Sequence, residues 1–139
     1  MATSRRGPWI EYLSEGECWH LLSLHTVGRV GILVGGAPEI YPVNYTVDGT
    51  SIVFRTDPGN KLRSIASTPE VCFEVDGLDF EHETGWSVLV KGSGAEVPAE
   101  EVGAKARDDL MLWAIGERTH WVRISPHEVT GRRLGRGVE

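Results

Sequence analysis

The chain has 139 residues, with 14 Lys and Arg against 20 Asp and Glu, and a formal net charge of −6. Its length suits one domain, and its acidic balance argues against a nucleic-acid binder. We expect a cytoplasmic protein, because the chain has no apolar stretch of the roughly 18–20 residues that a membrane helix needs, no signal-peptide core, and too few cysteines (two) for a disulfide scaffold.

Residues 1–13 show no sustained hydrophobic period, so we expect an N-terminal arm ahead of a single domain over 14–139. Ser14 and Glu17 form the Ser-x-x-Glu pattern of a capping box at a helix start. Apolar positions then recur at helical spacing, with His25 among them as a packing histidine. Gly28 is expected to end this helix.

Six later segments have the apolar runs or the alternation typical of β-strands. They are 29–34, 39–47, 51–56, 71–75, 85–97 and 119–124. Gly35-Gly36 and Asp48-Gly49 separate the first three as hairpin turns. Gly92 and Gly94 predict a bend, a bulge or a close backbone approach in the fifth.

Two more helices are expected between these strands, one at 61–67, which Pro69 ends, and one at 99–113. Residues 76–84 are expected to form an acidic loop, and the residues after 124 a basic tail. Strands joined mostly by tight turns, with helices at the periphery, predict a mainly β fold. We therefore expect a six-stranded antiparallel barrel.

The side chains that most often perform catalysis show no recognisable pattern. The histidines and cysteines lack metal-ligand spacing, so no metal site is expected. Cys18 and Cys72 lie inside predicted elements, where a thiol usually acts as a small apolar group, and the Gly-x-Ser-x-Gly nucleophile motif does not occur. No catalytic residue is assigned.

A candidate anion site lies where the predicted third strand ends. Arg55 and Thr56 close that strand, a turn follows, and Lys61 opens the next helix. Cationic side chains, a hydroxyl and the free N–H groups of a helix start are the donors that bind phosphate. The alternative is that Arg55 and Lys61 are solvated rim charges, and the spacing favours neither.

Seven segments in this order resemble the pyridoxamine 5′-phosphate oxidase-like proteins, which are FMN-binding split β-barrels. The resemblance runs from Glu17 to Arg133 and rests on EIYPVNY at 39–45, IVFRT at 52–56, GNKL at 59–62, TPEVCFEV at 68–75, GWSVLVKG at 85–92, WVRISP at 121–126 and TGRR at 130–133. The segments at 42–45 and 71–75 are most similar to the small branch that contains nitroimidazole-resistance proteins.

The resemblance implies a homodimer with FMN held in grooves between its subunits. The implied phosphate contacts are Arg55, Thr56 and Lys61 with the adjacent Leu62; the implied ring contacts are Pro42, Val43 and Asn44; and the implied contacts from the other subunit are Trp86 and Ser87. An alternating aromatic more often belongs to a core, but the motif favours the groove for Trp86. Arg132 and Arg133 are candidate substrate contacts, with solvated tail charges as the equal alternative.

The resemblance implies the function of an FMN-dependent oxidoreductase. Its small-molecule substrate is unidentified, and the reaction would use hydride transfer at flavin N5. Arg55 replaces the histidine of the nitroimidazole-resistance branch, and Arg123-Ile124-Ser125 replaces the Arg-x-His pair with which pyridoxamine phosphate oxidases grip the vitamin phosphate. These departures argue against both activities. The alternatives are a deazaflavin-dependent reductase and a non-catalytic protein that binds flavin, haem or a tetrapyrrole.

Overall fold

Six antiparallel strands close into a barrel in the computed structural model, which describes residues 6–111 and 120–137. The neighbours run β7-β4-β3-β2-β5-β6, and β6 pairs with β7 to close the ring. The strands are β2 (Val27–Val34), β3 (Ala37–Asp48), β4 (Ser51–Thr56), β5 (Glu70–Asp79), β6 (Thr84–Val97) and β7 (His120–Gly135). The prediction of a six-stranded antiparallel barrel is thus confirmed.

The turns and the bulge follow from glycines. Gly35 and Gly36 have φ values of 58° and 83° and join β2 to β3, so this hairpin needs residues that tolerate positive φ. The pairing of β6 with β7 shifts register between Lys91 and Gly92. A Cβ added at Gly92 would lie 2.3 Å from the carbonyl oxygen of Ser125, which confirms the expected close backbone approach.

Three α-helices and one 3-10 helix of the described residues surround the barrel. They are α1 (Glu15–Ser23), α2 (Asn60–Ser67), η1 (Ala99–Glu101) and α3 (Ala104–Met111). The capping box of α1 is confirmed, because Ser14 Oγ accepts from the Glu17 N–H and Glu17 Oε1 accepts from the Ser14 N–H. None of these helices in the described ranges is long and apolar enough to cross a membrane.

The helix ends differ from two predictions. The first helix ends at Ser23, and Gly28 lies in β2, where a Cβ would be 2.3 Å from Phe73 Cζ. This glycine therefore makes room for an aromatic ring and does not stop the helix. The predicted helix over 99–113 is divided into η1 and α3, and Trp113 lies outside the described residues.

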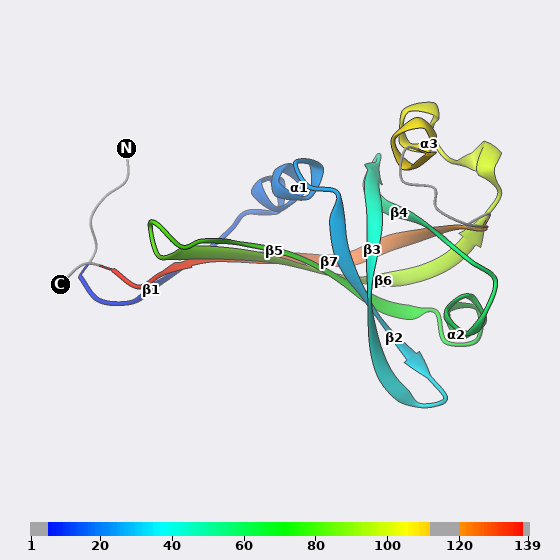
Figure 1. Ribbon diagram of the computed structural model, residues 1–139, viewed down its shortest axis with the longest axis horizontal. Coiled ribbons are helices and arrows are strands. Elements are labelled where there is room, and N and C mark those ends of the chain that lie inside the picture. Colours follow the sequence, from blue (N-terminus) through cyan, green and yellow to red (C-terminus); the bar gives the residue numbers. More distant parts are fainter. Residues whose placement is uncertain (1–5, 112–119, 138–139) are drawn as a thin grey trace.

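A long ribbon of β5, β6, β7 and β1 (Trp9–Tyr12) extends from the barrel (Figure 1). Residues 9–12 of the predicted arm thus form a strand on the edge of β7. Residues 76–79 of the predicted acidic loop belong to β5, and most of the basic tail belongs to β7. Sequence periodicity missed these extensions because their outward side chains are mixed polar and apolar, without the buried face that produces alternation.

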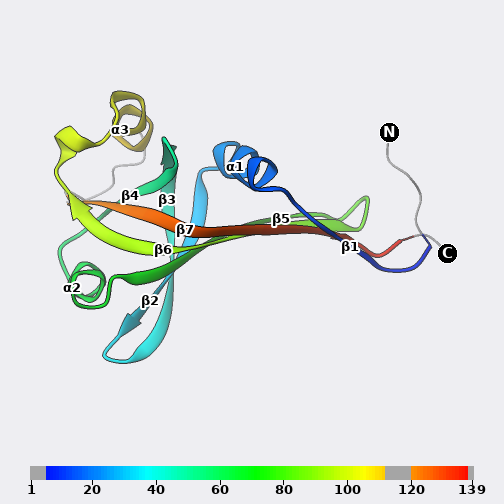
Figure 2. The ribbon, with the colours of Figure 1, turned by 180° about the vertical axis from the view of Figure 1, so that it is seen from behind.

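The core fills the barrel and is closed by helices. Leu22 of α1 and Ile65 of α2 pack with the inward side chains of all six barrel strands. A second cluster lies between β4 and α3, and its members are Val53, Val102, Ala106, Leu110 and Trp121. Seen from behind, α1 lies beside the ribbon, and α2 and α3 lie at the barrel (Figure 2).

Candidate functional site

One side of the sheet carries a broad exposed surface, which we call the outer sheet face. It consists of the alternate side chains of β3, β2, β5, β6, β7 and β1 that point away from the barrel core. Strand register sets these residues in rows, so that Asp76, Ser87, Arg132 and Tyr12 lie side by side across four strands. Several large apolar residues on this face are at least 40% exposed, among them Ile10, Tyr12, Leu33, Ile40, Leu78 and Leu134.

Four of the predicted site residues lie on the outer sheet face. Pro42 and Asn44 come from β3, Ser87 from β6 and Arg132 from β7. Pro42 is paired in register with Arg29 of β2, and Ser87 with Arg132. The structure therefore places the predicted ring contacts and the predicted contacts from the other subunit on the same face of one chain, separated by β2 and β5.

Their sequence neighbours point to the opposite face, because side chains alternate along a strand. Val43 is 6% exposed and belongs to the core. Arg133 Nη1 lies 3.8 Å from Glu11 Oε1. The Trp86 ring lies 4.8 Å from the His25 ring, centroid to centroid, and packs against the core. Strand alternation thus divides the predicted pairs Trp86/Ser87 and Arg132/Arg133.

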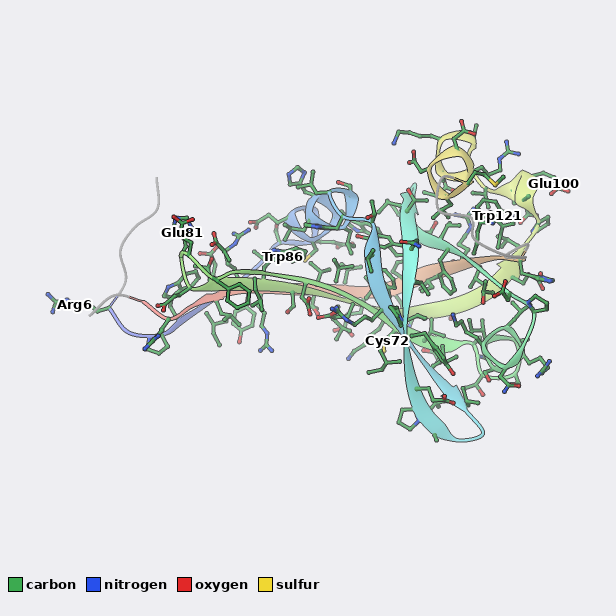
Figure 3. The ribbon with its side chains drawn as sticks, viewed as in Figure 1. Arg6, Cys72, Glu81, Trp86, Glu100 and Trp121 are labelled. Carbon is green, nitrogen blue, oxygen red and sulfur yellow. The ribbon has the colours of Figure 1, made fainter. Side chains whose placement is uncertain are left out.

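Two residues assigned to packing are in fact exposed. His25 follows the end of α1 and rests on Trp86, which Figure 3 shows on the ribbon beside α1. Cys72 lies on the outer sheet face next to Gly31 of β2, because outward positions alternate with the buried Val71 and Phe73. Only Cys18, which is fully buried, behaves as the small apolar residue that was predicted.

The end of β4 sends Arg55 and Thr56 in opposite directions. The Arg55 guanidinium lies 4.9 Å from the ring centroid of Trp121, on the α3 side of the strand, and its Nη1 is 3.3 Å from Met111 Sδ. Thr56 is 4% exposed, and its hydroxyl donates to the Asp57 carbonyl at 3.3 Å. Arg55 Nε is buried and has no hydrogen-bond acceptor among the residues described.

The start of α2 is a positive site beside β3. Lys61 Nζ lies 4.8 Å from the ring centroid of Tyr41, a cation–π contact that joins the helix to the strand of Pro42 and Asn44. Gly59 provides no side-chain cap, and the first turn contains no acidic residue. The first backbone N–H groups and the helix dipole therefore favour an anion here. Leu62 packs against the barrel core.

Two hollows lie in the outer sheet face. One has a volume of about 390 Å³ and is lined by Tyr12, Glu74, Ser87, Leu89, Thr130, Gly131 and Arg132; we call it the Arg132 groove. The other, of about 410 Å³, is mainly apolar and includes Ile40, Cys72 and His127. Sequence reasoning missed Tyr12, which stands in no motif, and gave no role to Glu74 of the 68–75 segment, since only the strand register brings them to Arg132.

An ion-pair cluster lies beside the Arg132 groove. Arg29 Nη1 lies 2.8 Å from Glu74 Oε1 and 3.3 Å from Asp76 Oδ1. Burial raises the pKa of Glu74, the neighbouring Asp76 raises it further, and Arg29 opposes both. Asp76 and Glu74 together raise the pKa of Arg29. Arg29 thus engages Asp76, which lies in the row of Arg132, and Glu74, which lines the groove.

The comparisons with known proteins agree with this architecture. The family described as pyridoxamine 5′-phosphate oxidase matches residues 14–133. An uncharacterized Mycobacterium tuberculosis protein is 38% identical over 95 residues, or 67% of this chain and 84% of that protein. The structure of an FAD-binding protein from Mycobacterium smegmatis is 35% identical, with a TM-score of 0.67, over 90% of this chain and 98% of that chain.

A second solved structure supports the fold alone. It is an FAD-binding protein from Mesorhizobium loti, 24% identical, with a TM-score of 0.77 over 94% of this chain and 100% of that chain. The family match begins at the cap of α1 and reaches Arg133 in β7, so it includes residues of every barrel strand.

Proposed function

Because the chain belongs to the pyridoxamine 5′-phosphate oxidase family, we propose that it binds a flavin and is a flavin-dependent oxidoreductase of a small-molecule substrate. The observation that carries the proposal is the uncapped, cationic start of α2 in contact with β3. A bound flavin supplies the redox chemistry, accepting a hydride at N5, while the protein supplies binding, orientation and electrostatics. This agrees with a sequence in which no catalytic side chain is recognised.

The donor set at α2 suits a flavin phosphate. Lys61 and the first backbone N–H groups of α2 would hold the phosphate, and Arg63 in the same turn adds positive charge. Thr56 and Arg55 are further predicted contacts, and the buried Arg55 Nε is a donor for which no acceptor is found among the described residues. Pro42 and Asn44 are the predicted contacts for the ring, and they lie on the opposite face of β3 from Tyr41.

A homodimer would complete the site. In a two-fold interface both chains use the same surface. If one residue of the first chain contacts a second residue of its partner, that second residue of the first chain contacts the first residue of the partner. Pro42 and Asn44 of one chain would then face Ser87 of the other, although the two sets are separated within a chain. The exposed apolar residues of the outer sheet face support such an interface, since a monomer rarely exposes so many together.

FMN is the cofactor that the resemblance implies, and FAD is favoured as the second candidate by the 35% identical relative, which is an FAD-binding protein. The two flavins share the ring and the first phosphate, so the start of α2 serves either.

We also propose that the protein works in the cytoplasm. Cys18 and Cys72 are free thiols, and a reducing compartment keeps thiols in this form.

Titration of the purified protein with FMN and with FAD tests the proposal, with flavin fluorescence as the measurement. We expect saturable quenching, and Lys61→Ala should weaken it about tenfold or more, since a charge-assisted contact is lost. Lys105→Ala is the matched control, because its side chain is 92% exposed and lies on α3. Protein that binds neither flavin but binds deazaflavin, haem or a tetrapyrrole would contradict the proposal.

A further inference from the structure

The Arg132 groove collects hydrogen-bond donors around one cation. Arg132 lies in β7 between Ser87 of β6 and Tyr12 of β1, its partners in register on either side. Thr130 is the preceding outward residue of β7, paired with Leu89. The guanidinium and three hydroxyl side chains therefore line one hollow of about 390 Å³. Leu89 and Gly131 form apolar parts of the lining of this hollow.

Arg132 differs from the other arginines nearby, because each of those has an acidic partner. Arg29 engages Glu74 and Asp76, Arg133 engages Glu11, and Arg136 Nη1 lies 3.1 Å from Glu83 Oε1. Within the part of the chain that the structure describes, Arg132 makes no ion pair and no side-chain hydrogen bond. Its guanidinium keeps its donors available beside three hydroxyls, and no direct ion pair neutralises its charge.

We propose that the Arg132 groove binds the anionic group, carboxylate or phosphate, of a small-molecule substrate. A guanidinium presents paired N–H donors that match either oxyanion, and the hydroxyls of Tyr12, Ser87 and Thr130 add donors around it. The Glu74 carboxylate also lines the groove, but it is engaged by Arg29 at 2.8 Å, a guanidinium that it shares with Asp76. The substrate role rests on the proposed function, because Ser87 is shared with the proposed flavin site; the binding of an anion does not.

Two-dimensional NMR of the full chain tests the proposal. Inorganic phosphate and acetate are titrated separately, at an ionic strength held constant with sodium chloride. We expect saturable shifts at the backbone amides of Tyr12, Ser87 and Arg132, and the stronger of the two titrations identifies the preferred oxyanion. Arg132→Gln should weaken this binding about tenfold or more, whereas Arg136→Gln, which removes the same charge two residues beyond Leu134, should leave it unchanged.

The same spectra show whether each variant is folded, so the loss of binding can be separated from the loss of structure. Shifts that do not saturate, or that are equal in Arg132→Gln and the unchanged protein, would overturn the proposal. The flavin titration separates the two proposals. Lys61→Ala should lose flavin and keep the response to anions, and Arg132→Gln should do the reverse. If the protein binds the anion but no flavin, the proposal for the Arg132 groove stands and the proposed function is contradicted.

Discussion

The two faces of the same strands differ in almost every property. Phe73, Val88 and Val122 point into the barrel and are 0% exposed, whereas Ile40 and Leu78 on the outer sheet face are 71% and 70% exposed. Burying the first group stabilises the chain by about 1.5–3 kcal/mol for each side chain. The second group contributes little to one chain alone. The inner face thus accounts for folding, and the outer face is left for binding.

Adjacent residues therefore have different roles. Arg133 pairs with Glu11 beside Trp86 on the inner side of the ribbon, while Arg132 faces the outer groove without an ion pair among the described residues. Val43 is core, while Asn44 lies on the outer sheet face. Substitutions at neighbouring positions are expected to separate stability from ligand binding, and the following predictions test that separation.

The largest effect is expected for Phe73→Ala. Its ring is 0% exposed, lies 4.8 Å from the Tyr45 ring and covers Gly28. Removing it should lower the free energy of unfolding by about 3–5 kcal/mol. Ile40→Ala on the outer sheet face should change it by less than about 0.5 kcal/mol. Urea unfolding at a concentration at which the chain is monomeric measures both, and equal losses would contradict the division of the faces.

Gly92→Ala should have an intermediate effect, because the new methyl group would meet the backbone of Ser125 at 2.3 Å and of Pro126 at 2.9 Å. Backbone atoms cannot rotate away, so we expect a loss of about 1–3 kcal/mol in the free energy of unfolding. Thermal unfolding followed by circular dichroism measures it. Gly16→Ala is the control, since a Cβ there meets nothing within 4 Å; a loss as large as that of Gly92→Ala would refute the explanation.

Tyr45→Phe should cost about 1 kcal/mol, because the buried hydroxyl donates to the Leu22 carbonyl at 2.6 Å and joins β3 to α1. Burial also raises the pKa of Tyr45 above its ordinary value of 10.0. The unfolded chain then loses this proton first, so the free energy of unfolding falls as the pH rises above 10.0. In unfolding experiments at several pH values, the free energy of unfolding of the variant should fall less steeply above pH 10.0 than that of the unchanged protein. An equally steep fall would contradict this account.

A small effect is expected for Arg29→Gln on the outer sheet face. Its side chain is 50% exposed, so the pairs with Glu74 and Asp76 contribute less than about 1 kcal/mol to folding and less still at high salt. Unfolding at low and high ionic strength measures this contribution. A loss comparable to that of Phe73→Ala would show that the outer sheet face, too, holds the chain together.

Much of the barrel could be predicted from the sequence because its signals are local. The Gly35-Gly36 hairpin, the capping box at Ser14 and the alternation of β6 each lie within a few residues, and the structure confirms all three. The ribbon beyond the barrel could not be predicted in the same way. Residues 9–12 become a strand only because β7 lies beside them, and their own pattern is short and mixed.

The candidate site depends still more on distant contacts. Arg55 lies against Trp121 and Met111, neither of which its neighbours in sequence reveal. Arg29 and Glu74 are 45 positions apart, and their pairing leaves Arg132 as the cation of its groove without an acidic partner among the described residues. The motif at 85–92 identified Ser87, but only the register of β6 with β7 shows that Ser87 and Arg132 share a hollow.

Sedimentation of the flavin-loaded protein, followed at the visible absorbance of the flavin, tests the central claim most directly. If the outer faces of two chains build the site, the flavin should sediment with a particle of two chains at micromolar concentration. Ile40→Asp, a charge on the outer sheet face, should release both the partner and the flavin. A flavin that sediments with a single chain, or a dimer that binds no flavin, would contradict the account.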